Sequence, residues 1–93
     1  MKSFDWSAEK NQWLRQERGI SFEDIILHLA AGDLLDKMVH PNKERYPGQG
    51  IYVVNVSGYA YLVPFVESES EVFLKTIIPS RKATQRYLKG HPS

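Results

Sequence analysis

The sequence predicts one small α+β domain that spans residues 1–93. Helical patterns fill residues 7–31, and segments rich in β-branched and aromatic residues fill most of the chain after residue 34. Helices that precede a sheet in this way are typical of the α+β class. Ninety-three residues suffice for one modest core, and a hydrophobic content of 42% excludes a chain too polar to fold.

Two helices are predicted near the start of the chain. The first covers residues 7–18, and Ser7 can cap its N-terminus. The second covers residues 22–31, because its apolar residues recur at i, i+3, i+4 and i+7. Ser21 precedes this helix and Asp24 stands at the capping-box position, so its start is well defined.

Strand-like segments follow the two helices. The hairpin dipeptide Ser57-Gly58 joins two of them, and Pro64 places the second of these at an edge or near a bulge. The last segment is apolar enough to be central, and Ser80 can cap a short helix after it. Short turns between the segments predict a mainly antiparallel sheet of three or four strands. The predicted strands cover residues 34–39, 51–56, 59–66 and 72–78, the last helix covers about 81–89, and residues 4–6 form a short strand or an extended lead-in.

The composition argues against several classes of protein. Because there is no cysteine, neither a disulfide scaffold nor a thiolate zinc site is possible. The three histidines lack the spacing of metal ligands and no glycine-rich phosphate loop occurs, so we expect neither a metal nor a cofactor. No apolar run approaches the ~18 residues of a membrane span, and the N-terminus has no apolar signal core. A cytoplasmic protein without membrane contact is therefore expected.

The charge is distributed unevenly, although the net value is only +1. Residues 1–71 carry seven Lys and Arg against eleven Asp and Glu, a balance of −4. Residues 72–93 carry five Lys and Arg and no acidic residue, a balance of +5. A purely basic end on an acidic body indicates either a local anion site or a solvated basic tail.

The residues from the last predicted strand into the last helix suggest how an anion could be held. Lys75 lies in mid-strand among apolar neighbours, and Arg81 begins the helix, where backbone N–H groups and the dipole favour anions. With the Ser80 hydroxyl, these two cations could clamp a phosphate. The alternative is a solvated strand end followed by an ordinary helix cap.

Motifs at both ends of the chain resemble a known family. They are Phe4-Asp5-Trp6, Glu9-Lys10-Asn11, the joint Gly19-Ile20-Ser21-Phe22-Glu23, and the run Lys75-Thr76-Ile77-Ile78-Pro79-Ser80-Arg81-Lys82-Ala83. Together they are similar to the BrnT toxins of bacterial type II toxin–antitoxin systems, part of the wider RelE/ParE-like group. The resemblance implies a compact α+β endoribonuclease that cleaves RNA without a metal. It also implies a cognate antitoxin of the ribbon-helix-helix type, through which alone the toxin would contact DNA.

Metal-free cleavage of RNA needs a base for the ribose 2′-hydroxyl, donors for the phosphorane, and an acid for the leaving oxygen. Lys75 and Arg81 match the basic positions of the family and are the candidate donors, although the family usually has arginine where Lys75 stands. His40 is the candidate acid and base, because imidazole exchanges protons near neutral pH; its alternative is a loop residue without a role. Glu67 or Glu44 could replace it as the base.

Further side chains are candidates for contact with RNA. Basic and hydroxyl groups would bind phosphates, and tyrosines would stack on bases. The alternative for the last tyrosine is a packing anchor of the final helix. The candidate RNA-binding residues are Ser80, Lys82, Arg86, Tyr46 and Tyr87.

A non-catalytic, protein-binding subunit is the rival reading of the same sequence. Such a subunit would bind the antitoxin as a co-repressor, or would inhibit another target as ParE-like toxins do. Exposed edge strands invite a partner segment, and a net charge near zero does not favour broad binding of RNA. A third alternative is a globular domain whose basic tail only aids solubility.

Overall fold

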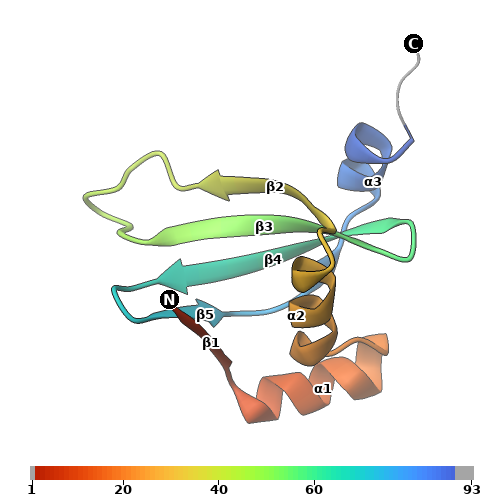
Figure 1. Cartoon of the computed structure of the whole chain (residues 1–93), viewed down its shortest axis with the longest axis horizontal. Coiled ribbons are helices and arrows are strands. Elements are labelled where there is room, and N and C mark those ends of the chain that lie inside the picture. Colours follow the sequence, from red (N-terminus) through yellow and green to blue (C-terminus); the bar gives the residue numbers. More distant parts are fainter. Residues whose placement is uncertain (1, 90–93) are drawn as a thin grey trace.

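The computed structural model describes residues 2–89, and this part of the chain forms three helices and six strands (Figure 1). The α+β class predicted from the sequence is confirmed. In chain order the elements are β1 (Ser3–Trp6), α1 (Ala8–Arg18), α2 (Phe22–Ala30), β2 (Leu34–Val39), β3 (Gln49–Val56), β4 (Tyr59–Glu67), β5 (Glu71–Leu74), β6 (Ile78–Pro79) and α3 (Arg81–Tyr87).

The sheet is mixed and larger than the three or four strands predicted. Its strand order is β1-β5-β4-β3-β2, and β6 pairs with β4 off this path. All pairings are antiparallel except that β1 runs parallel to β5, with Phe4 opposite Val72. The segment before the first helix is therefore an edge strand. From the sequence, this segment was either a short strand or an extended lead-in.

The predicted strand over 72–78 is wrong in its middle. The chain leaves the sheet after Leu74 and returns at Ile78, so two short strands replace one long one. Because of this break, Leu74 and Ile77 enter the same core, although residues three positions apart on an unbroken strand lie on opposite faces. β5 lies between β1 and β4, so the expected interior position is correct for this part.

Pro64 lies in an interior strand, since β4 pairs with β3 on one side and with β5 and β6 on the other. Its carbonyl accepts the N–H of Lys75 at 2.8 Å, in the gap between β5 and β6. The N–H and C=O of a strand residue point to the same side. The missing N–H of Pro64 therefore faces the gap and breaks no ladder bond.

The helix boundaries follow the caps seen in the sequence. The Ser7 hydroxyl accepts the N–H of Lys10 at 3.2 Å, at the start of α1. At α2 the capping box is complete, because the Ser21 hydroxyl accepts the Asp24 N–H at 3.1 Å and the Asp24 carboxylate accepts the Ser21 N–H at 2.9 Å. α3 begins after the Ser80 cap as predicted and ends at Tyr87, two residues earlier than expected.

The helices cover the two faces of the sheet unequally. α1 and α2 pack on one face, where Leu14, Phe22 and Ile25 meet side chains of β3, β4 and β5 in the main core. α3 packs on the opposite face in a smaller cluster, over Val53 and Ala60 with Leu35 and Leu62 beside them. It stands at the end of the sheet with the β3–β4 hairpin, opposite the loop between β2 and β3 (Figure 1). Among the residues described, no helix is long and apolar enough to span a bilayer.

Candidate functional site

The part of the sheet that α3 leaves uncovered forms a pocket of about 390 Å³. Its floor is a row across three strands, because Met38 of β2 lies opposite Ile51 of β3, and Ile51 lies opposite Pro64 of β4. Lys75 follows next in the row, since its N–H bonds to the Pro64 carbonyl. The strand register therefore builds the pocket on the face of the sheet that α3 partly covers.

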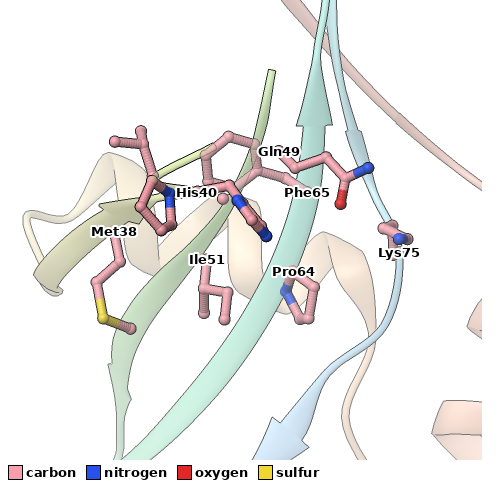
Figure 2. A pocket seen from close by; sticks show the side chains of 10 residues that line it. Met38, His40, Gln49, Ile51, Pro64, Phe65 and Lys75 are labelled. Atoms are coloured by element: carbon pink, nitrogen blue, oxygen red, sulfur yellow. The ribbon is translucent and has the colours of Figure 1, made fainter. Parts of the chain in front are cut away.

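Three polar side chains line this pocket: those of His40, Gln49 and Lys75. His40 follows directly on β2, Gln49 begins β3, and Lys75 follows β5. Figure 2 shows them around one opening, with the His40 ring over its middle and Lys75 at its edge. The structure thus brings together two of the three residues predicted to act on RNA, which are 35 positions apart in the sequence.

The imidazole of His40 is held by its own loop. The backbone N–H of Asn42 donates to Nδ1 of His40 at 3.0 Å, and the Tyr46 ring packs against the imidazole with centroids 4.2 Å apart. A backbone N–H can point only at an unprotonated ring nitrogen, so the neutral ring carries its proton on Nε2. In this arrangement Nε2 of His40 is a hydrogen-bond donor, a different role from the general acid and base that the sequence suggested.

Two glycines let the loop lie close against the sheet. Gly48 has φ of +73°, and its carbonyl oxygen accepts a 2.7 Å hydrogen bond from the N–H of Glu67. A Cβ on Gly48 would lie 2.1 Å from the Glu67 carbonyl oxygen, and a Cβ on Gly50 would lie 2.5 Å from a ring carbon of Phe65. No residue with a Cβ fits at either position. The two glycines therefore fix the backbone on both sides of Gln49.

The basic residues of α3 lie away from the pocket. β6, which leads into α3, pairs with Tyr61 and Leu62, whereas the pocket row crosses β4 at Pro64. Tyr61 and Pro64 are three positions apart along the strand, about 10 Å. Arg81 is exposed and does not line the pocket, so the predicted convergence of Lys75, Arg81 and His40 does not form. The other two exposed cations of this helix are Lys82 and Arg86.

Two candidate RNA-binding residues of this region have structural partners. The Ser80 hydroxyl accepts the N–H of Ala83 at 3.0 Å as the helix cap. The Tyr87 hydroxyl donates to Asp36 of β2 at 2.6 Å, which raises the pKa of the phenol and lowers the pKa of the Asp36 carboxyl. Tyr87 therefore ties α3 to β2, as the alternative reading held.

The two candidate carboxylate bases lie outside the pocket. Glu67 borders a second hollow of about 310 Å³, which shares His40 with the first and is also lined by Tyr46. Its carboxylate forms salt bridges with Nζ of Lys2 at 2.6 Å and with Nζ of Lys37 at 3.7 Å. The hydrogen bond from Lys2 holds the pKa of Glu67 below its ordinary value and Lys37 adds to this, so Glu67 is a weak base. Glu44 is exposed in the loop.

Gln49 is the one polar lining residue that sequence reasoning missed. A lone glutamine carries no signal of its own, and only its place between Gly48 and Gly50, at the end of a proline-rich loop, sets it apart. Within residues 2–89, no group of three His, Asp or Glu side chains gathers closely enough to hold a metal ion. The pocket offers donors of hydrogen bonds, one amide and an apolar floor.

Comparisons of the chain with protein-family models, with curated proteins and with solved structures each found no match.

Proposed function

We propose that this protein is a metal-independent endoribonuclease and the toxin of a bacterial type II toxin–antitoxin pair, with a RelE/BrnT-like arrangement of its α+β fold. One observation carries the proposal: a lysine and a histidine whose Nδ1 accepts a backbone N–H line the same open pocket. The motifs at both chain ends that resemble BrnT toxins support it independently.

The reaction follows from the groups available. The ribose 2′ oxygen attacks the adjacent phosphorus, the bond from phosphorus to the 5′ oxygen breaks, and a 2′,3′-cyclic phosphate and a 5′-hydroxyl result. Lys75 and His40 donate to the phosphorane oxygens, which carry more negative charge than the ground state. Water takes the 2′ proton and returns one to the leaving oxygen, so the reaction consumes no proton.

This division of roles predicts a slow enzyme. General acid–base catalysis typically contributes about 10²- to 10⁴-fold. Among the described residues, no carboxylate lines the pocket, and His40 holds its proton on the wrong nitrogen to accept one at Nε2. The rate enhancement then comes from charge stabilisation and positioning.

The exposed cations of α3 have a supporting role in the proposal. Arg81, Lys82 and Arg86 bind phosphates of the same RNA strand outside the pocket, where screening by salt weakens each contact. The acidic remainder of the chain confines this attraction to one end of the molecule. The surface that contacts RNA is therefore small. The proposed reaction takes place in the cytoplasm, where the transcripts are.

The direct test is cleavage of a short single-stranded RNA in the presence of EDTA. Wild-type protein should yield 2′,3′-cyclic phosphate ends, and a substrate with 2′-deoxyribose at the cleaved position should stay intact. Lys75→Ala should lower kcat about 10²-fold, the size expected for loss of one oxyanion donor. Lys10→Ala is the matched control, because Lys10 lies on α1 and lines no part of the pocket.

Equal cleavage by Lys75→Ala, or cleavage of the deoxy-substituted strand, would contradict the ribonuclease assignment. The toxin–antitoxin part is tested by coexpression with the product of the neighbouring short reading frame. A ribbon-helix-helix-like product that copurifies and restores growth supports the pair. A product that neither binds nor restores growth rejects it.

A second function, that of a non-catalytic protein-binding subunit, is favoured by the free edge of β2. This strand has one neighbour, and its exposed apolar side chains include Leu34 and Met38, each 41% exposed, and Val39, which is 55% exposed. A partner segment could extend the sheet there, in a co-repressor complex or in inhibition of another target. If a His40→Ala/Lys75→Ala double variant arrests growth as strongly as wild type, this second function replaces the first.

A further inference from the structure

The side-chain amide of Gln49 is the polar group of the pocket that the proposed reaction does not use. Within residues 2–89 it makes no hydrogen bond, whereas the Gln49 backbone is held at both ends. The His40 N–H donates to the Gln49 carbonyl at 2.9 Å, and the Gln49 N–H donates to the Tyr46 carbonyl at 3.4 Å. A fixed backbone thus presents an amide without a partner, and Figure 2 shows it on the Lys75 side of the pocket.

The rest of the lining determines what kind of group the amide could meet. Met38, Ile51 and Pro64 form an apolar floor, and the remaining polar groups are the two donors assigned to phosphate. An amide offers one donor and one acceptor side by side, the pattern that reads the edge of a nucleobase. The pocket volume of about 390 Å³ lies within the range of small-molecule sites.

The apolar floor distinguishes between the bases. Adenine is the only one of the four RNA bases without a carbonyl oxygen, so once its amino group and N7 are paired it leaves the least polar surface against the floor. A carbonyl of uracil, cytosine or guanine placed there would lose its hydrogen bond to water without a replacement. Glutamine pairs with the amino group and N7 of adenine through both atoms of its amide.

We propose that this pocket binds an unstacked adenine base of single-stranded RNA, and that Gln49 is the residue that selects it. The inference rests on the proposed function, since it places the selected base beside the phosphate that Lys75 and His40 hold. The base lies on Ile51 and Pro64. Its amino group donates to the side-chain Oε1 of Gln49, and the side-chain Nε2 of Gln49 donates to N7 of the base. Cleavage then occurs next to adenine.

The test separates binding from cleavage. Short RNA strands with 2′-O-methyl ribose cannot be cut, so their affinity can be measured by calorimetry with the full chain. Four strands differ only in one central base, which is flanked on both sides by the same adenine-free sequence. Wild type should bind the strand with a central adenine about tenfold more tightly than the others, within the discrimination that one bidentate pair supplies.

Variants of Gln49 should remove this preference. Gln49→Ala deletes the amide, and Gln49→Glu keeps the shape while replacing the donor to N7 with an acceptor. Gln12→Ala is the matched control, because Gln12 is an exposed glutamine of α1. We expect both Gln49 variants to bind all four strands within about twofold of one another and Gln12→Ala to keep the wild-type preference.

The failures of the two proposals are distinguishable. Adenine preference with no cleavage of unmodified RNA keeps the adenine pocket and rejects the ribonuclease. Cleavage without base preference, or a preference that survives in both Gln49 variants, rejects the adenine pocket and keeps the ribonuclease. If no strand binds and the neighbouring gene product instead protects Gln49 and Ile51 from hydrogen exchange, the pocket belongs to a protein interface and the inference is overturned.

Discussion

The backbone N–H of Asn42 donates to Nδ1 of His40 at 3.0 Å, and this bond sets which ring nitrogen carries the proton. Both a general base and a general acid at Nε2 would need a proton on Nδ1 during the cycle, where it would oppose the Asn42 N–H. In the proposed reaction, His40 would therefore act on RNA as a hydrogen-bond donor as long as the loop keeps this arrangement. The distinction can be tested by substitution.

His40→Gln should keep most of the ribonuclease activity, because an amide N–H replaces the imidazole N–H as a donor. His40→Ala should lower kcat about 10²-fold, the usual effect of removing one such donor. Initial rates of RNA cleavage for the two variants measure this difference. If His40→Gln is as inactive as His40→Ala, the imidazole transfers protons and the assigned tautomer does not describe the active state.

Acid should destabilise the protein through Glu67. The hydrogen bond from Lys2, with Lys37 nearby, lowers the pKa of Glu67 in the folded state. A lowered carboxyl pKa contributes stability above the unfolded value, and this contribution is lost as the pH falls through the folded value. Urea denaturation should show a falling free energy of unfolding below about pH 4.

Glu67→Gln should flatten this acid limb, because the variant has no carboxylate to protonate at the bridge between Lys2 and Lys37. Glu69→Gln is the control, since Glu69 is exposed in the turn after β4, and it should follow the wild-type curve. An equally steep acid limb in Glu67→Gln would assign the pH dependence to the other carboxyls with lowered pKa, those of Glu23 and Asp36.

Asn11 should be required for the joint between the first two helices. Asn11 is buried. Its side-chain Oδ1 accepts the Phe22 N–H at 2.7 Å, and its side-chain Nδ2 donates to the Glu23 carboxylate at 2.7 Å. Asn11→Ala leaves the Phe22 N–H without a partner, at a cost of about 1–3 kcal/mol. Chemical denaturation measures this loss. Gln12→Ala, on the exposed side of α1, should leave the free energy of unfolding unchanged.

Gly50→Ala should destabilise the sheet beneath the pocket. The added Cβ would lie 2.5 Å from a Phe65 ring carbon and 2.5 Å from the Met38 carbonyl oxygen. Overpacking of this kind costs about 1–3 kcal/mol. In a Phe65→Leu background the ring is absent, so the same glycine substitution should cost less. A cost that is identical in both backgrounds would place the strain entirely on the backbone of β2.

Local features of the fold were predictable because they depend on neighbouring residues. The Ser7, Ser21 and Ser80 caps and the Ser57-Gly58 hairpin each satisfy backbone groups within a few positions along the chain. Non-local features were not. The parallel pairing of β1 with β5 and the interior position of β4 depend on which strands meet after the chain collapses.

The candidate site divides in the same way. Charge counts and motifs in the sequence made Lys75 and Arg81 candidates to act on a phosphate, and the chemistry of imidazole added His40. Strand register then separated them: Pro64 and Ile51 bring Lys75 beside His40, while the break after Leu74 carries Arg81 to the far end of the sheet. Residue chemistry is a property of the chain, and it was readable there. Convergence is a property of pairings between distant segments, and only the tertiary structure settles those.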